Sequence, residues 1–259
     1  MTYELLAERV AVITAGTAGI GRAIAEAFIE QGAKVVVNGR SSEKGREAVR
    51  QIGGDDRIAF FPGSATDQSV VEGLVDFAVE RFGRLDIAVA NAGGTGESKP
   101  VMEMHDDEWQ YELDLNLNHT FWLTRRALPH LVDTGTGRVI AISSLEGKEG
   151  KPGVSGYTAN KHAINGFVKS VAREVGTRGV TVNSICPGLV MTDMLREKAG
   201  KALGEPGVDG VVQRYTQYTA LQRCVTPEEI AALAVFLASD ASSGITGGLL
   251  SVDGGSAFY

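Results

Sequence analysis

The sequence predicts one α/β domain, residues 1–259, whose core is a doubly wound, seven-stranded parallel sheet with helices on both faces. The chain has 259 residues, of which 43% are hydrophobic, and this size and composition suit a single domain of that class. Short β-branched runs alternate with helical stretches along the chain. Parallel neighbouring strands need such crossovers, because a tight turn cannot join their ends.

Seven apolar, β-branched runs are expected to form the strands, and no repeat or linker interrupts their alternation with helices. They are residues 9–14, 34–38, 57–61, 85–90, 138–144, 180–186 and 248–252.

The first strand leads into a glycine-rich turn, residues 15–21 (AGTAGIG), and then into a helix. A helix N-terminus offers free backbone N–H groups and a positive dipole end, and glycines let a ligand approach closely. Glycines alone indicate only a tight turn, but the strand before them and the helix after them are the context that a dinucleotide fingerprint requires.

Charge and composition exclude several classes of function. The formal net charge of −7 disfavours nucleic acid and anionic membranes as partners, since both attract basic surfaces. Residues 1–8 hold two acidic side chains and no long apolar segment, so we expect neither a signal peptide nor a membrane span, and a cytoplasmic location. The two cysteines fit a reduced compartment, and the four scattered histidines predict no metal site.

Ser144, Tyr157 and Lys161 form a candidate proton-transfer device. Tyr157 and Lys161 lie one turn apart if their segment is helical. A free Tyr titrates near about 10, and a neighbouring cation is expected to lower that pKa toward the operating range. Ser144 ends the fifth predicted strand, so its hydroxyl could donate to a substrate oxygen at the same point. A Tyr and a Lys at this spacing are common on helices, so the pair carries weight only with the other motifs.

Those motifs follow in a fixed order: the turn at 14–21, Asn91-Ala92-Gly93, Asn116, the Ser144–Tyr157–Lys161 set, Pro187-Gly188 with Thr192, and VDGG at 252–255. In this order and spacing the chain resembles the classical short-chain dehydrogenase/reductase family over residues 6–255. The resemblance implies a Rossmann-type fold and an NAD(P)-dependent enzyme that transfers a hydride reversibly between nicotinamide and a ketone or secondary alcohol.

The resemblance also implies the roles of the catalytic residues. Ser144 and Tyr157 would bind the carbonyl oxygen, Tyr157 would donate the proton, and Lys161 would hold the nicotinamide ribose. Asn116 would position water that reloads the proton through Lys161, although it could equally cap or kink its helix. The implied cofactor-binding residues are Thr14, Gly16, Thr17, Gly19, Ile20, Gly21, Arg40, Ser41, Ser64, Ala65, Asn91, Ala92, Gly93, Tyr157, Lys161, Pro187, Gly188, Val190 and Thr192.

Two positions depart from the family pattern. Ala15 stands where the family usually has Gly, and because Ala tolerates positive φ poorly, an intact turn predicts a negative φ at this residue. Ser64 stands where an Asp commonly holds the adenine ring. Ser64 can still form hydrogen bonds, so we expect the adenine pocket to survive with altered contacts.

The end of the second strand favours NADP(H) over NAD(H). Gly39 occupies the place of the Asp that binds ribose hydroxyls in NAD-preferring relatives, and Arg40 follows it. Without the carboxylate, the guanidinium can pair with a 2′-phosphate. Ala18 stands where many NADP-dependent relatives have a second basic residue, and Arg40 could instead be a solvated residue at a helix start.

The expected substrate is a free, medium-sized or cyclic ketone or secondary alcohol, because the implied pocket is mostly apolar. The expected lining residues are Ser144, Leu145, Glu146, Val154, Tyr157, Leu189, Met194 and Leu195. Residues 191–219, rich in Gly and polar side chains, are interpreted as a substrate lid rather than a variable surface loop. The short loop 147–151 resembles that of polyketide ketoreductases.

Two other functions stay open. A reductase of 3-oxoacyl thioesters on an acyl-carrier protein is disfavoured, because residues 133–137 supply no basic side chain before the Ser-bearing strand, although Arg173 and Arg178 remain. A non-catalytic NADP-binding sensor or scaffold normally lacks the Tyr or the Lys, and this chain retains both.

The resemblance implies a homotetramer, because helices 106–131 and 155–177 correspond to those that pair across the main interface in relatives. The apolar end, Ala257-Phe258-Tyr259, either packs on a neighbouring subunit or frays.

Overall fold

A parallel sheet forms the centre of the computed structural model, which describes residues 4–192, 195 and 207–256. Its strand order is β3-β2-β1-β4-β5-β6-β7, and every pairing is parallel. The strands are β1 (Val10–Ile13), β2 (Lys34–Gly39), β3 (Ile58–Pro62), β4 (Ile87–Ala90), β5 (Arg138–Ile142), β6 (Thr181–Pro187) and β7 (Leu249–Val252). The predicted fold class and all seven predicted strands are confirmed.

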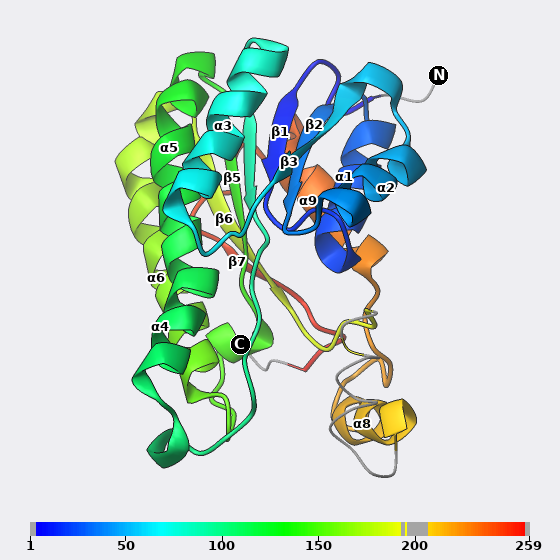
Figure 1. Ribbon diagram of the computed structural model, residues 1–259, viewed down its shortest axis with the longest axis vertical. Coiled ribbons are helices and arrows are strands. Elements are labelled where there is room, and N and C mark those ends of the chain that lie inside the picture. Colours follow the sequence, from blue (N-terminus) through cyan, green and yellow to red (C-terminus); the bar gives the residue numbers. More distant parts are fainter. Residues whose placement is uncertain (1–3, 193–194, 196–206, 257–259) are drawn as a thin grey trace.

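Helices cover both faces of this sheet. One layer holds α1, α2 and α9, and the opposite layer holds α3, α5 and α6 (Figure 1). The described helices are α1 (Gly19–Glu30), α2 (Ser42–Ile52), α3 (Gln68–Phe82), α4 (Asp106–Leu113), α5 (His119–Thr134), α6 (Ser155–Val175), α8 (Gly207–Thr216) and α9 (Pro227–Ala238).

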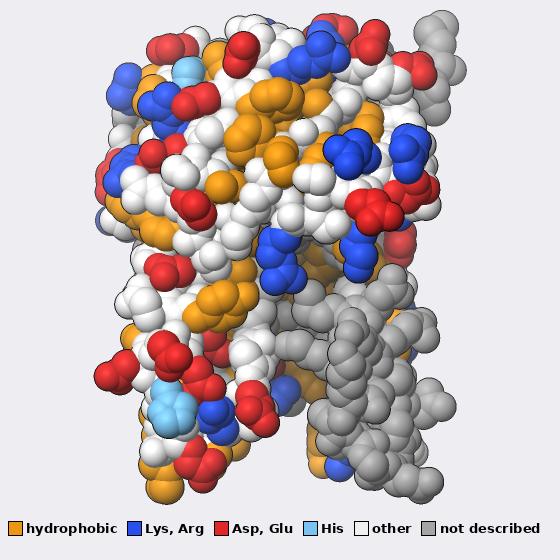
Figure 2. All heavy atoms as spheres, in the orientation of Figure 1, with side chains coloured by type: hydrophobic (Ala, Val, Ile, Leu, Met, Phe, Trp, Pro, Cys, Tyr) orange, Lys and Arg blue, Asp and Glu red, His pale blue; other side chains and the backbone are white. Residues whose placement is uncertain are grey.

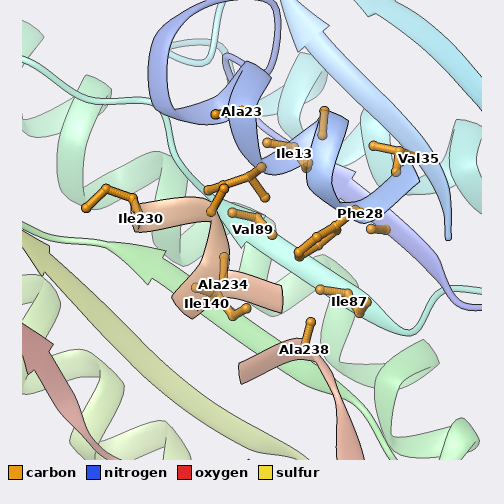
Figure 3. Close-up of a cluster of buried hydrophobic side chains, with 14 of the residues drawn as sticks. Ile13, Ala23, Phe28, Val35, Ile87, Val89, Ile140, Ile230, Ala234 and Ala238 are labelled. Carbon is orange, nitrogen blue, oxygen red and sulfur yellow. The ribbon is translucent and has the colours of Figure 1, made fainter. Parts of the chain in front are cut away.

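The sheet separates two apolar cores because successive side chains of a strand point to opposite faces. Ala11 and Ile13 of β1 join the core beneath α1 and α9, whereas Val10 and Val12 join the core beneath α3, α5 and α6. Figure 3 shows the first core, where Phe28 of α1 lies among side chains of the sheet and of α9. Strands buried on both faces explain the continuous apolar runs of the sequence.

The stretch predicted as one helix over 106–131 is instead three consecutive pieces. α4 ends at Leu113, a π-helical turn spans Asp114–Asn118, and α5 begins at His119 and continues to Thr134. The single-helix prediction was therefore wrong in the middle of the stretch. The extra residue of a π turn cannot be read from apolar spacing, because the apolar stripe continues on both sides of it.

The surface agrees with the acidic composition. On the face shown in Figure 2, Lys and Arg side chains are interspersed with Asp and Glu, and no broad basic surface is present there. None of the helices in the described part of the chain is long and apolar enough to cross a bilayer.

Candidate active site

The strand order reverses between β1 and β4, and the candidate site lies at the carboxyl ends of these strands. β1 pairs with β2 on one side and with β4 on the other, so the crossovers leave these two strands in opposite directions. Such a switch point is where doubly wound sheets bind ligands. α4 and α8 both lie beyond this end of the sheet, on opposite sides of it (Figure 1).

The N-terminus of α1 is open to an anion. Its N-cap residue, Ala18, offers no side-chain hydrogen bond, and its first turn holds no acidic residue. The first intrahelical N–H is that of Arg22, which donates to Ala18 O at 3.2 Å. The N–H groups of the three preceding helical residues, Gly19, Ile20 and Gly21, lack such a partner, and this is the arrangement that binds phosphate.

The glycines of this region are close to other parts of the chain. A Cβ on Gly16 would lie 2.8 Å from Val37 Cγ1, and one on Gly19 would lie 3.4 Å from Thr192 Cγ2. Thr192 follows β6, so the structure brings this predicted cofactor residue to the glycine turn. The free N–H groups at this helix end, together with glycines that keep side chains out of the turn, therefore fit the phosphates of a dinucleotide.

Asn91 holds the turn in place. Its backbone N–H donates to Thr14 Oγ1 at 2.9 Å, and its side-chain Nδ2 donates to Thr14 O at 2.9 Å and to Ala15 O at 3.2 Å. The backbone N–H of Ala92 also donates to Thr14 Oγ1, at 3.0 Å. The amide nitrogen of Asn91, predicted to contact the cofactor, is thus engaged in joining β4 to the end of β1.

Ala15 contradicts the predicted negative φ. Its φ is +50°, in the left-handed region that costs a residue with a Cβ roughly 1–2 kcal/mol. The turn is nonetheless intact, because Gly16 N–H donates to Asn38 O at 2.9 Å and Ala15 O accepts from Asn91. These bonds fix the backbone on both sides of Ala15, so the conformation persists despite the side chain.

The end of β2 presents a cation and has no room for a carboxylate. A Cβ on Gly39 would lie 2.9 Å from Thr17 Oγ1, so an Asp there would displace Thr17. Arg40 is exposed and forms no hydrogen bond or ion pair with any residue that the structure describes. Ser41 caps α2 by accepting from Lys44 N–H at 3.3 Å.

Ser64 and Ala65 follow β3 on the adjacent strand end. Ser64 Oγ is within 2.8 Å of Thr66 Oγ1 and accepts from Thr66 N–H at 3.3 Å. Ser64 therefore orders its own loop, and Ala65 beside it is buried.

Ser144 and Tyr157 meet as predicted. Ser144 is the N-cap residue of a short 3-10 helix after β5, Leu145–Gly147, and Tyr157 lies in the first turn of α6. The Ser144 hydroxyl lies close enough to the Tyr157 hydroxyl to lower the pKa of Tyr157 by hydrogen bonding.

Lys161 lies beside Tyr157, and Lys161 and Asn116 both border Gly93. Lys161 Nζ lies 5.4 Å from the centroid of the Tyr157 ring and donates to Ile142 O at 2.8 Å. A Cβ on Gly93 would lie 2.9 Å from Lys161 Nζ and 3.0 Å from Asn116 Oδ1, so a larger residue there would displace one of these side chains. The structure thus brings together all four predicted catalytic residues.

Asn116 has the structural role that the sequence left open. Its Nδ2 donates to Glu112 O at 2.8 Å and to Gly94 O at 2.9 Å, and its Oδ1 accepts from Gly94 N–H at 3.1 Å. It is therefore the side chain that holds the π turn against the loop after β4.

The predicted lowering of the Tyr157 pKa is contradicted. Burial raises the pKa of Tyr157 to about 12, the hydrogen bond with Ser144 opposes this shift, and the carboxylates of Glu146 and Glu112 add to it. Burial also lowers the pKa of Lys161 to about 8. Desolvation is the larger effect on a phenol inside the protein, and it outweighs the neighbouring cation on which the predicted lowering depended.

The predicted substrate residues separate into groups. Glu146 contacts Ser144, Leu145 is buried within the same 3-10 helix, and Leu189 and Leu195 are half-buried. Val154 lines a cavity of about 430 Å³ whose other lining residues are Met104 and residues from α4, 96–99 and 153–156, and do not include Tyr157. Met194 lies outside the described residues, as does much of the predicted lid at 191–219.

The segment after β6 is held by backbone contacts to the end of β7 and to Val225. Gly188 N–H donates to Val252 O at 3.0 Å, and a Cβ on Gly188 would lie 2.8 Å from Asp253 Cα. Pro187 ends β6, and Val190 bridges to Val225.

Sequence reasoning missed two residues near the site. Glu112 is buried, and its Oε1 accepts from Gly96 N–H at 2.8 Å and from Thr95 Oγ1 at 3.1 Å; its position four residues before Asn116, on the same helical face, was an available signal. Tyr215 of α8 shares electrostatic interactions with Tyr157 and Glu146, and its only signal was an aromatic residue within a polar segment. Among the described residues, no group of three or more His, Cys, Asp or Glu could hold a metal ion.

Comparisons with known proteins agree with this geometry. Residues 14–257 match the family model described as Enoyl-(Acyl carrier protein) reductase. The chain is 37% identical to 3beta-hydroxysteroid dehydrogenase 2 of Eggerthella lenta, over 98% of this chain and 97% of that protein. It is 35% identical to the 3-oxoacyl-[acyl-carrier-protein] reductase FabG of Chlamydia muridarum, over 98% and 99% of the two chains. It is 36% identical to the NADP-dependent (R)-specific alcohol dehydrogenase of Lentilactobacillus kefiri, over 97% and 98%. The chain therefore belongs to the short-chain dehydrogenase/reductase family and is an oxidoreductase of that family.

Proposed function

We propose that the protein transfers a hydride between NADP(H) and a ketone or secondary alcohol, with Tyr157 as the acid in reduction and the base in oxidation. The observation that carries this proposal is the placement of Tyr157, whose ring centroid lies 5.4 Å from the buried Lys161 Nζ and whose pKa the Ser144 hydroxyl lowers by hydrogen bonding. The open N-terminus of α1 at the same end of the sheet supports a phosphate-bearing cofactor.

In the reduction, the bound cofactor supplies the hydride. The hydroxyls of Ser144 and Tyr157 hold the carbonyl oxygen. Tyr157, with a pKa raised by burial to about 12, is protonated at neutral pH and donates its proton as negative charge develops on that oxygen. Lys161, whose pKa of about 8 keeps most of it charged at neutral pH, then stabilises the phenolate.

Lys161 also returns a proton to Tyr157. Its ammonium and Asn116 Oδ1 both border the space beside Gly93, and a water held there by Asn116 would pass a proton to Lys161. Asn116 thus combines the structural role of holding the π turn with a positioning role in the reaction.

Two observations support a preference for NADP(H): the exposed position of Arg40 at the end of β2 and the NADP dependence of one relative. Arg40 is exposed, is unpaired within the described structure, and follows Gly39, whose place cannot accept a carboxylate without displacing Thr17. A free guanidinium at this strand end pairs strongly with a phosphate. The alcohol dehydrogenase of Lentilactobacillus kefiri is described as NADP-dependent.

We favour a free ketone or alcohol over a carrier-bound thioester. Arg138, the first basic residue of the β5 region, is buried and donates to Thr136 O at 2.8 Å and to Gly137 O at 3.0 Å, so it cannot dock an acidic carrier. Arg173 is exposed but lies sixteen residues beyond Tyr157 on α6, about 24 Å away at 1.5 Å per residue. The reductase of Chlamydia muridarum keeps the thioester reaction as the second candidate.

A panel assay separates these possibilities. NADPH consumption is measured with free ketones, β-keto thioesters and quinones, and with NADH in place of NADPH. We expect free ketones to be reduced, and Tyr157→Phe, which keeps the ring, to serve as the matched inactive protein. Turnover of thioesters alone would favour the second candidate, and NADPH binding without turnover of any substrate would favour a sensor or scaffold.

We further propose that the protein is a cytoplasmic homotetramer that associates through α5 and α6. Phe121 of α5 is 39% exposed and packs edge-to-face on Phe167 of α6 with ring centroids 6.2 Å apart. Leu128 and Val171 continue this apolar groove between the two helices. Light scattering at assay concentration tests the proposal, and a fully active monomer near 27.3 kDa would contradict it.

A further inference from the structure

The carboxylate of Glu146 accepts the hydroxyl proton of Ser144. Ser144 Oγ donates to Glu146 Oε2 at 2.5 Å and accepts from Glu146 N–H at 3.3 Å. The same hydroxyl lowers the pKa of Tyr157 by hydrogen bonding. A serine hydroxyl has one proton and two lone pairs. The single Ser144 proton cannot be donated to Glu146 Oε2 and to a second acceptor at the same time.

A substrate carbonyl has to compete for the same proton. The carbonyl oxygen can accept from Ser144 only if the serine proton leaves Glu146 Oε2. The Glu146 side chain is only 15% exposed, so water has limited access to replace the lost donor. A largely buried carboxylate oxygen without a donor is unfavourable. A simple ketone is therefore bound at the expense of the Glu146 hydrogen bond.

We propose that Glu146 forms a subsite for a hydroxyl group on the carbon next to the carbonyl, so that the favoured substrates are α-hydroxy ketones and the matching vicinal diols. This inference rests on the proposed function. The substrate hydroxyl donates to Glu146 Oε2 and replaces the serine proton, which turns to the carbonyl oxygen. Oxygens on adjacent carbons lie close enough to address Ser144 and Glu146 together, because these two groups are themselves in hydrogen-bond contact.

The charges around the subsite favour a neutral donor. Lys151 Nζ lies 3.6 Å from Glu146 Oε1 and 5.3 Å from the centroid of the Tyr215 ring, so a second cation would be repelled. An anionic group would face the Glu146 carboxylate itself. A hydroxyl avoids both repulsions.

The reaction balances with the hydroxyl unchanged. A hydride adds to the carbonyl carbon, the Tyr157 proton passes to the carbonyl oxygen, and the neighbouring carbon keeps its hydroxyl, which gives a vicinal diol. Glu146 neither gains nor loses a proton in this step.

The test measures binding separately from turnover. The protein saturated with NADPH is titrated by calorimetry with cyclohexane-1,2-diol, as each isomer, and with cyclohexanol. No reaction occurs, because cofactor and alcohol are both reduced. We expect one diol isomer to bind about tenfold more tightly or better, as a hydrogen bond to a charged acceptor implies. Equal affinity for diol and mono-alcohol would overturn the inference.

Variants assign the preference to Glu146. Glu146→Ala should abolish the advantage of the diol and raise the affinity for cyclohexanol, because the Ser144 proton becomes available. Glu146→Gln, which keeps the shape and an acceptor without the charge, should reduce the advantage. Glu149→Ala is the matched control, since Glu149 has no hydrogen bond to Ser144, and it should keep the advantage. An advantage that survives in Glu146→Ala would overturn the inference.

Turnover then separates this inference from the proposed function. Equal reduction of cyclohexanone and 2-hydroxycyclohexanone, with no diol advantage in binding, would leave the proposed function standing and overturn the subsite. A diol advantage that depends on Glu146, without reduction of any ketone, would support the subsite and overturn the proposed function.

Discussion

Replacing Lys161 by Met should make the protein more stable and inactive. Lys161 is 2% exposed, and burial lowers its pKa to about 8. The folded protein thus holds a charge that the interior disfavours. Methionine has a similar length and flexibility, so Lys161→Met removes the charge without opening a large cavity.

The magnitude follows from the two pKa values. The difference between 10.5, the ordinary value, and about 8 corresponds to roughly 3 kcal/mol. The variant also loses the bond from Lys161 Nζ to Ile142 O, which offsets about 1 kcal/mol of this gain. We therefore expect the free energy of unfolding at pH 7 to rise by about 2 kcal/mol.

The sign of the pH dependence is fixed by the same values. Between pH 8 and 10.5 the unfolded chain binds more protons at this Lys than the folded protein does, so the stability contributed by Lys161 rises with pH in this window. The destabilisation caused by burying the charge of Lys161 is fully present below about pH 8. The advantage of Lys161→Met should therefore shrink by roughly 2 kcal/mol between pH 7 and pH 9.5.

Urea unfolding at both pH values, at one protein concentration, measures this effect. Lys169→Met on the exposed side of the same helix is the control, and it should change the free energy of unfolding by less than about 0.5 kcal/mol. A Lys161→Met variant that is less stable at pH 7, or that gains the same amount at both pH values, would refute the reasoning.

Three other substitutions test the site. Tyr157→Phe should lower turnover by at least roughly 100-fold with little change in the dissociation constant for NADPH, and near-normal turnover would remove Tyr157 as the acid. Arg40→Ala should lower the ratio of kcat/KM for NADPH to that for NADH by about 10- to 100-fold, since a bond to a charged group contributes about 1.5–3 kcal/mol; an unchanged ratio would make Arg40 a surface charge. Ala15→Gly should raise the free energy of unfolding by up to about 1 kcal/mol, because relief of the left-handed strain exceeds the entropy cost of Gly. A lower urea midpoint for that variant would contradict the strain.

The sheet was predictable because burial on both faces leaves long apolar runs in the sequence, and these matched the seven strands within a few residues. The catalytic set was predictable for a different reason. Ser144 follows a strand, and Tyr157 and Lys161 share one helical face, so each local prediction placed one side chain at the same end of the sheet.

What the sequence could not predict depends on contacts between distant segments. The φ of Ala15 is held by hydrogen bonds to Asn38 and Asn91, and the raised pKa of Tyr157 comes from burial, with an added contribution from Glu112 of another helix. The contact between Ser144 and Glu146 is local in the sequence. Its effect on the site depends on Tyr157, which lies on another helix and interacts with the same hydroxyl.

The π turn at Asp114–Asn118 also sets the rotational phase between α4 and α5. One residue in an α-helix corresponds to about 100° of rotation. Deleting a single residue there would allow an unbroken α-helix, and α5 could still pack on the sheet, but α4 would turn by that angle. Glu112 would then leave Gly96 and Thr95, which it holds at present. The π turn thus allows α5 to pack on the sheet while Glu112 of α4 holds the loop beside the reacting groups.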